Sequence, residues 1–292
     1  MNLVRRLVDE DMEVVCFGRE LSPHWPGQAR AVLGDFHKAP DALLAELSGS
    51  TVFHLVSSSR PSPNTERAGL ELEQNLGATL RILEASREGN CRWVFASSGG
   101  TVYGEAQTDR VAEDHPTNPI SSYGVSKLAT EKYLMLYKAI HGLDVTVARI
   151  ANPYGPWQLG SKGQGLIATL LRKIAAGEPI DIWGDGEMVR DYVYIDDTVD
   201  ALLTIARSAQ SGSVYNVGSG IGTSINQLTA EISALLSADP VLRYAPPRGV
   251  DVRRNVLDIT RITRDLGWAP KTSLAEGVSR TKNWLESHAL VI

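Results

Sequence analysis

The chain has 292 residues, of which 43% are hydrophobic, so it can bury one large core or two smaller ones. Its 29 basic and 34 acidic residues give a net charge of −5, which excludes the strongly basic surface typical of nucleic-acid-binding proteins. No apolar run approaches the roughly 20 residues that span a bilayer, and the first residues lack the features of a signal peptide. We therefore expect a cytoplasmic protein without nucleic-acid or membrane partners.

Residues 1–150 alternate short β-rich runs with helical patterns. Apolar residues recur at helical spacing in the first eight residues, which predicts a helix there. The alternation that follows is typical of a doubly wound parallel sheet covered by helices on both faces. The predicted strands lie within 12–17, 29–35, 50–56, 91–98 and 143–150, and the predicted crossover helices within 70–88 and 121–141.

After about residue 152 the pattern changes to longer loops with Gly and Pro, short strands and an amphipathic helix within 165–177. We interpret this change as the start of a smaller α/β lobe. The two cysteines, Cys16 and Cys91, form no CxxC or Cys/His cluster, so we predict buried thiols and no metal site.

The segment SSYGVSK at 121–127 gives the strongest chemical signal. Tyr123 and Lys127 are four residues apart on a predicted helix and therefore share one face. The pair alone is a weak signal, but the strand VFASS upstream ends in hydroxyl residues followed by two glycines, and strand ends are where α/β sheets present catalytic groups. We predict that a serine hydroxyl joins Tyr123 and Lys127, and the sequence alone leaves Ser97 and Ser98 open for this role.

The chemistry of these three residue types fits proton transfer from an alcohol. A free tyrosine has a pKa near 10 and is mostly protonated at neutral pH, so it needs help to act as a base. We expect the Lys127 ammonium to favour the phenolate, and the serine hydroxyl to hydrogen-bond the same substrate oxygen.

Ser98, Tyr123 and Lys127 resemble the Ser/Thr, Tyr, Lys set of the extended short-chain dehydrogenase/reductase family. The resemblance favours Ser98 over Ser97, because the family places its hydroxyl directly before the two glycines. More narrowly, the chain is similar to nucleotide-sugar epimerases of the UDP-glucose 4-epimerase type. The order and spacing of several further motifs carry this resemblance over nearly the whole chain. They are GDF at 34–36, VFHLVSS at 52–58, QNLGATLRILEA at 74–85, ARIANPYGP at 148–156, IWGDGEMVRDYVYIDD at 182–197, YNVGSG at 215–220 and LGWAPKTSLAEGV at 266–278.

The resemblance implies a Rossmann-like dinucleotide-binding domain at 1–152 together with about 193–222. It implies a nucleotide-sugar-binding lobe at about 153–192 and 223–292. It also assigns cofactor contacts, with adenine at Asp35 and Phe36, support of a neighbouring loop at Asn75, and the remaining contacts at His54, Val56, Ser57, Ser97, Tyr123, Lys127, Ile150 and Pro153.

The substrate contacts are expected in both parts of the chain. Arg149, Asn152 and Pro153 are expected to follow another strand end, where the nicotinamide and substrate should meet, and Asn152 is our first choice for the substrate diphosphate. A guanidinium group suits a diphosphate well, and Arg190 is favoured for that role. The full set implied by the resemblance is Ser98, Asn152, Leu166, Arg190, Arg248 and Asp251.

Two departures from the family pattern concern the cofactor. The strand at 13–17 should lead to an acidic residue that binds the ribose, but Gly18 and Arg19 follow it, so NADP is the alternative to NAD. The first strand and glycine-rich turn of the fold do not precede the opening helix. We expect a start upstream of Met1, with natural loss of the segment as the alternative, and weak dinucleotide binding by the 292 residues alone.

The resemblance implies a nucleotide-sugar 4-epimerase that transiently oxidises the sugar at C4. A 4-ketoreductase uses the same triad and is the enzymatic alternative, whereas Gly99 and Gly100 stand where 4,6-dehydratases need an acidic pair. A non-catalytic nucleotide-sugar-binding relic is the alternative of another class. The family also implies a homodimer in which helices at about 68–87 and 121–141 form a four-helix bundle.

Overall fold

The computed structural model describes the chain in two compact units, each with its own core. Unit 1 comprises residues 1–102, 116–149 and 201–215, and unit 2 comprises 103–115, 150–200 and 216–292. The described residues are 1–20, 22, 24–38, 41–58, 68–87, 89–160, 165–247 and 252–288.

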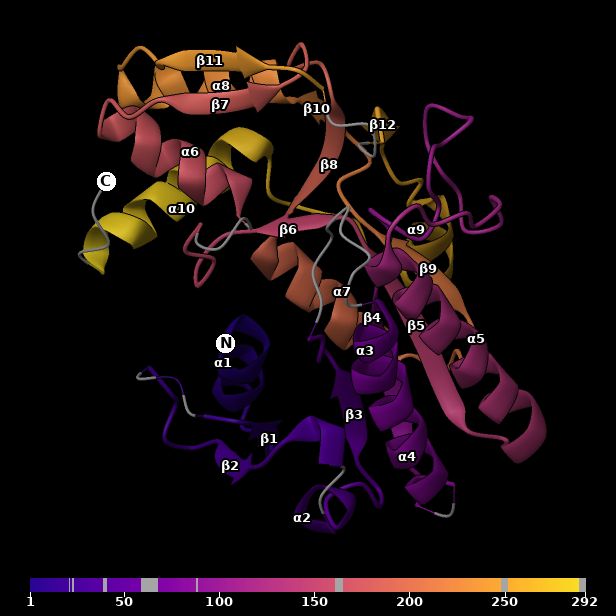
Figure 1. The fold of residues 1–292 in the computed structure, drawn as a ribbon. Coiled ribbons are helices and arrows are strands. Elements are labelled where there is room, and N and C mark those ends of the chain that lie inside the picture. The colour runs from indigo at the N-terminus through magenta and orange to yellow at the C-terminus, as the bar shows by residue number, and fades with distance from the viewer. Residues whose placement is uncertain are drawn as a thin grey trace. The chain divides into compact units, whose positions relative to one another are not determined.

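Strands and helices alternate through unit 1, as the sequence predicts (Figure 1). The strands are β1 (Val15–Gly18), β2 (Arg30–Leu33), β3 (Thr51–His54), β4 (Arg92–Ser98) and β5 (Asp144–Ile150). The helical elements are α1 (Asn2–Asp9), η1 (Phe36–Lys38), α2 (Asp41–Leu44), α3 (Ala68–Leu72), η2 (Glu73–Gly77), α4 (Ala78–Ala85) and α5 (Ser122–His141).

The parallel strands form two sheets among the described residues. β1 pairs with β2 in a two-stranded sheet, and a four-stranded sheet has the order β3-β4-β5-β9, where β9 is Val214–Val217. β3 and β4 are parallel, with Thr51 opposite Arg92 and His54 opposite Phe95. Ser97 and Ser98 are the last two residues of β4, beyond the part of the strand that pairs with β3.

The core of unit 1 lies between this sheet and the helices α4 and α5. It includes the fully buried rings of Trp93 and Phe95 and the side chain of Leu134 on α5. α5 begins with Ser121 as its N-cap, which accepts a hydrogen bond from the Gly124 amide, and ends at Gly142 in the left-handed conformation. Figure 1 shows α3, α4 and α5 side by side, in agreement with their contacts.

The core of unit 2 is built from β8, α6, α8 and α10, and it buries Ile182, Leu170, Leu171 and Leu228. β8 is the centre of one sheet, with β10 and β12 on either side and β6 also paired to it, while β7 and β11 form a separate parallel pair. The elements are β6 (Asn152–Tyr154), α6 (Leu166–Ala175), β7 (Ile180–Trp183), β8 (Val189–Tyr194), α7 (Ile195–Arg207), β10 (Gly222–Ser224), α8 (Ile225–Leu236), β11 (Leu242–Ala245), β12 (Arg254–Asn255), α9 (Thr260–Leu266) and α10 (Leu274–Ser287).

The boundaries of the two units differ from the domain limits expected from the sequence. The segment 103–115 belongs to unit 2, although it lies within the expected dinucleotide-binding domain. The segment belongs to unit 2 because Val111 forms a parallel bridge with Leu257 and because hydrogen bonds hold the segment to residues near the end of β9. Within the described part of the chain, no helix is both long and apolar enough to cross a membrane.

Candidate active site

The first two turns of α5 carry Tyr123 and Lys127 on one face. Gly124, between them, lets the helix approach the loop after β4 closely, because a Cβ at that position would lie 2.8 Å from the Thr101 carbonyl oxygen. Any other residue at 124 would push the helix away from this loop. The glycine therefore helps to place Tyr123 beside the end of β4.

The Ser98 side chain lies close enough to the Tyr123 phenol to influence its pKa. Burial raises the pKa of Tyr123 above its ordinary value of 10, and the Ser98 side chain opposes that rise. The sequence led us to expect that Lys127 would lower the pKa of Tyr123. In the structure desolvation is the stronger influence and the pKa of Tyr123 is raised, so the neutral phenol is the resting form.

Lys127 is buried beside the aromatic rings of Phe95 and Tyr123. Its Nζ donates a hydrogen bond to the Ala96 carbonyl oxygen at 2.8 Å and lies 4.8 Å from the Phe95 ring centre and 5.8 Å from the Tyr123 ring centre. Burial lowers the pKa of Lys127 to about 8, and the nearby Glu131 carboxylate opposes this shift. Lys127 therefore remains a cation at neutral pH, within reach of Tyr123.

The structure distinguishes the two serine hydroxyls at the end of β4. The Ser97 hydroxyl is buried and donates to the Glu131 carboxylate, whereas the Ser98 side chain lies beside the Tyr123 phenol. Arg149 is also turned inward, 4% exposed, and forms an ion pair with Glu131. Arg149 thus lies inside unit 1, and not at an open strand end as the sequence had led us to expect.

A pocket of unit 1 lies beside Tyr123 and Lys127. Part of its wall comes from β3 and the residues after it, including His54, Val56 and Ser57. The His54 ring is buried between aromatic rings, 5.4 Å from Phe36 and 5.3 Å from Phe95, and its Nε2 bonds the Thr79 hydroxyl at 2.8 Å. The other lining residues are Asn75, Thr79, Phe95, Ser126 and Thr130.

Asn75 holds the segment that follows β3. Its Oδ1 accepts a hydrogen bond from the Ser58 amide and its Nδ2 donates to the Glu71 carbonyl oxygen, both at 2.8 Å. Asn75 belongs to the π-helical turn η2, a departure from regular helix that is frequent at functional sites. This turn interrupts what the sequence predicted as one continuous helix.

The residues expected at the adenine end have different environments. The Asp35 carboxylate accepts a hydrogen bond from the His37 amide at 3.1 Å, and Phe36 packs against the core of unit 1. Arg19 is exposed. Phe36 therefore has a packing role in unit 1.

In unit 2, several expected substrate residues lie on or beside β6 and β8. The Asn152 side chain donates to the Asp191 carbonyl oxygen at 3.0 Å, and Arg190 Nη1 donates to the Val189 carbonyl oxygen at 2.9 Å. Leu166 begins α6 and is 36% exposed. Ile150 ends β5 and Pro153 lies within β6, whereas Arg248 and Asp251 are outside the described residues.

The model of the NAD dependent epimerase/dehydratase family matches residues 1–218. The chain belongs to this family. It is 38% identical to a UDP-glucose 4-epimerase of Mycolicibacterium smegmatis over 240 residues, which cover 82% of this chain and 77% of that protein.

Solved structures of family members have the same fold. The UDP-glucose 4-epimerase of Thermotoga maritima with UDP-glucose matches with a TM-score of 0.92 and 31% identity, over 98% of this chain and 95% of that one. The Thermus thermophilus UDP-glucose 4-epimerase in complex with NAD matches with a TM-score of 0.89 and 28% identity, over 98% and 94% of the two chains. The Rossmann-like α/β fold with a C-terminal lobe is thereby confirmed.

Two buried polar groups of this family member were not found from its sequence. The Asp191 carboxylate is fully buried and accepts hydrogen bonds from the Ser219 amide and hydroxyl, the Gly220 amide and the Leu257 amide. Burial raises the pKa of Asp191, and these four donors oppose that shift. The sequence signal available for this buried carboxylate was an acidic residue between apolar residues in VRDYVY.

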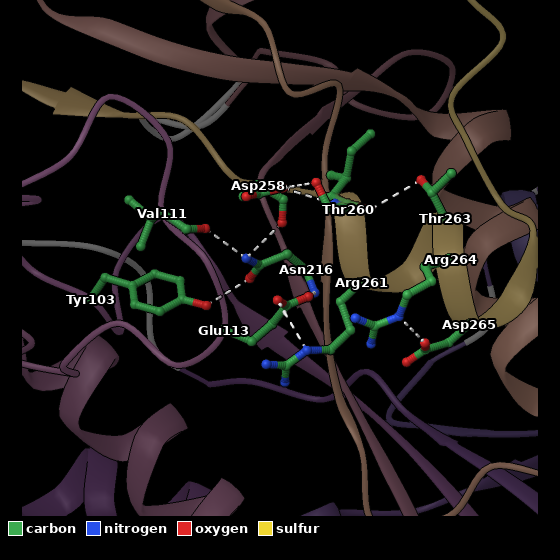
Figure 2. A network of polar contacts seen from close by, with 11 residues as sticks. Tyr103, Val111, Glu113, Asn216, Asp258, Thr260, Arg261, Thr263, Arg264 and Asp265 are labelled. Atoms are coloured by element: carbon green, nitrogen blue, oxygen red, sulfur yellow. Dashed lines mark hydrogen bonds and ion pairs between the residues drawn. The ribbon is translucent and has the colours of Figure 1, made fainter.

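The second group is a network within unit 2, centred on Asn216 (Figure 2). The Asn216 amide side chain accepts from the Tyr103 hydroxyl at 2.7 Å and donates to the carbonyl oxygens of Val111 and Asp258. Its backbone amide donates to the buried Glu113 carboxylate at 2.8 Å. These bonds explain why 103–115 folds with unit 2. No group of three His, Cys, Asp or Glu side chains among the described residues is arranged to hold a metal ion.

Proposed function

We propose that the protein is an NAD-dependent nucleotide-sugar 4-epimerase. The observation that carries the proposal is the placement of the Ser98 side chain beside the Tyr123 phenol at the end of β4, with the Lys127 ammonium one helical turn from Tyr123. A phenol, a hydroxyl and an ammonium in this arrangement suit the removal and return of an alcohol proton. Family membership and the similarity to UDP-glucose 4-epimerases supply the reaction class.

In this proposal Tyr123 first loses its own proton to solvent, the phenolate then removes the proton from the sugar 4-hydroxyl, and the phenol later returns it to the same oxygen. Ser98 hydrogen-bonds that oxygen and holds it beside the phenol. Lys127 stabilises the phenolate while it exists, because its ammonium is close to the ring and buried away from water. The cofactor, when bound, supplies the hydride acceptor and donor.

The residues of the unit 1 pocket fit the ribose and nicotinamide end of a dinucleotide. The Lys127 ammonium has three N–H donors, of which one is used by Ala96, and the hydroxyls of Ser57 and Tyr123 line the same pocket. Such a donor set suits the hydroxyl groups of a ribose. We propose Asp35 and Phe36 for the adenine end, with Arg19 as the residue that would admit NADP.

For the substrate we propose a nucleoside diphosphate sugar held by unit 2. Arg190 and Asn152 lie on adjacent paired strands, β8 and β6, and both carry N–H donors suited to phosphate oxygens. Leu166, Arg248 and Asp251 complete the proposed set.

An assay of both sugar epimers tests the function. The protein is incubated with NAD and UDP-glucose, and the appearance of UDP-galactose is followed by chromatography, with dTDP- and GDP-sugars as further substrates. Epimer formation in both directions supports the proposal. Net reduction of a 4-keto sugar by NADH without epimerisation would identify a ketoreductase, and binding of nucleotide sugars without any turnover would identify a non-catalytic relic.

We also propose a homodimer formed through α3 and α5. An apolar stripe on α5, made of Val125, Tyr133, Leu136 and Ile140, is exposed, with Ile140 63% exposed. Leu70 and Leu72 of α3 add to the exposed apolar surface, and the two helices are in contact. Large apolar side chains concentrated on neighbouring helices favour burial against a second copy.

A further inference from the structure

A buried ion pair lies one helical turn beyond Lys127 on α5. Glu131 and Arg149 are 2% and 4% exposed. Arg149 Nη2 lies 2.7 Å from Glu131 Oε2, and its Nε lies 3.1 Å from each carboxylate oxygen. The guanidinium of β5 thus holds the carboxylate of α5 in a forked geometry, which is the most directional form of this interaction.

The same carboxylate also binds β4. The Ser97 hydroxyl donates to Glu131 Oε1, while Lys127, four residues earlier on the helix, donates to the carbonyl oxygen of Ala96. Two consecutive turns of α5 are therefore joined to two consecutive residues of β4. The next residue of that strand is Ser98, which lies beside the Tyr123 phenol.

A buried ion pair is weak evidence of stability. Removing two charges from water is costly, and apolar residues of similar volume can often replace such a pair without loss. Placement of neighbouring groups is a better explanation of the pair here, because the carboxylate joins α5 and β4, the two elements that carry the proposed reacting groups, and β5 holds it in place.

We propose that Glu131 is a positioning residue, which together with Arg149 and Ser97 holds Ser98 and Lys127 at the spacing that Tyr123 requires. The proposal rests on the proposed function in that Tyr123 and Ser98 are taken as the reacting pair. Neither Glu131 nor Arg149 touches the substrate in this proposal.

The charge of Glu131 has a second effect on Lys127. The neighbours of the Lys127 ammonium are the Tyr123 phenol on α5, the Ala96 carbonyl oxygen on β4 and the His54 ring on β3. The pKa of His54 is lowered to about 3, so this ring is neutral. Glu131 raises the pKa of Lys127 against the effect of burial. Neutralising Glu131 would leave the Arg149 cation uncompensated nearby, and both changes would lower the pKa of Lys127.

The first test measures the titration of Lys127 directly. Protein labelled with ¹³C at lysine Cε is titrated by NMR, and the Lys127 signal is assigned by its loss in Lys127→Met. We expect a midpoint near 8 in the wild type, and a midpoint lower by about one pH unit in Glu131→Gln, as expected for loss of a close opposite charge. This readout does not depend on turnover, so it remains informative even if the proposed reaction is wrong.

The second test separates positioning from stability. Glu131→Leu combined with Arg149→Met removes both charges while keeping an apolar volume, so we expect a melting temperature close to that of the wild type. We still expect kcat to fall at least about tenfold, because reacting groups displaced by a fraction of an ångström lose much of their rate. Ser97→Ala should keep the Lys127 midpoint and lower kcat by a smaller factor.

The matched control is Glu113→Gln. Glu113 is also a buried carboxylate, with Arg261 as its ion-pair partner 3.4 Å away, but it belongs to unit 2. We expect this variant to lose stability without moving the Lys127 midpoint. If the double variant Glu131→Leu with Arg149→Met folds and keeps the wild-type kcat and Lys127 midpoint, or if Glu131→Gln leaves both unchanged, Glu131 has no positioning role.

Discussion

At the scale of single residues, Tyr123 is the group on which the proposed chemistry depends. Replacing Tyr123 by Phe keeps the ring and removes the proton acceptor, so we expect turnover to fall by about 10²-fold or more while the thermal melt stays close to that of the wild type. Steady-state assays of the purified variant measure the loss.

Tyr133→Phe is the matched control, because Tyr133 lies on the same helix and is 39% exposed. We expect this control to keep its activity. Retention of more than about a tenth of the wild-type rate by Tyr123→Phe would exclude Tyr123 as the general base.

From the buried His54 we predict that the protein loses stability in acid. Burial and the nearby Lys127 charge lower the pKa of His54 to about 3, from 6.5. Between these two values the unfolded chain binds more protons than the folded one, so stability is lost as the pH falls from 6.5 towards 3. We expect this residue to account for roughly 2 kcal/mol of lost unfolding free energy between pH 6 and pH 4.5.

Urea unfolding at the two pH values measures this effect, and His54→Leu should remove it. Thr79→Val is the control, since it deletes the hydrogen-bond partner of His54 but keeps the ring that titrates. This control should be less stable at both pH values with the wild-type difference between them. The same acid loss in His54→Leu would show that other groups cause it.

The sequence predicts the residues of the site better than their partners. Tyr123 and Lys127 could be placed on one face because helical spacing alone decides it. The choice between Ser97 and Ser98, and the inward turn of Arg149, depend on Glu131 meeting β4 and β5. That meeting is a property of packing between elements distant in sequence, which periodicity does not encode.

At the scale of elements, the segment 103–115 depends on Asn216. Replacing Asn216 by Ala leaves the Tyr103 hydroxyl and the carbonyl oxygens of Val111 and Asp258 without this buried partner. We expect a loss of about 2–4 kcal/mol in unfolding free energy, because several buried polar groups lose hydrogen bonds. Urea denaturation of the variant measures it.

Tyr103→Phe removes one bond of this network and serves as the graded comparison. Its cost should be about 1 kcal/mol. Equal stability of the wild type and Asn216→Ala would show that the network in Figure 2 does not hold the segment.

The strands β1 to β5 were predicted within a few residues, because each is a short run rich in apolar residues between turn or helical segments, whereas β9 was not predicted. The helix predicted at 70–88 is divided by the π-helical turn at Glu73–Gly77. This interruption coincides with the bonds that Asn75 makes to the segment after β3, and such tertiary contacts cannot be read from a local apolar pattern.

At the scale of the whole molecule, the proposed dimer gives the next prediction. Leu136 lies within the apolar stripe on α5 and is 46% exposed. Leu136→Lys would place a charge in the proposed interface, and an unpaired buried charge costs several kcal/mol, so we expect association to weaken by about 100-fold or more. Light scattering after size-exclusion chromatography, across micromolar concentrations, measures the change.

Leu235→Lys is the control, because Leu235 is 38% exposed on α8 in unit 2. It should leave the mass unchanged. A wild-type chain that is monomeric throughout this concentration range would exclude the dimer.

The division of the unit 1 strands into two sheets predicts which strands of unit 1 open locally. β1 and β2 form a parallel pair of four residues each, and a sheet of two short strands has little stability of its own. β4 and β5, with buried Trp93, Phe95 and Val147, lie inside the larger sheet. The backbone amides of Cys16 and Phe17 should therefore exchange with deuterium through low-energy local openings. The interior amides of β4 should exchange only when the whole unit unfolds.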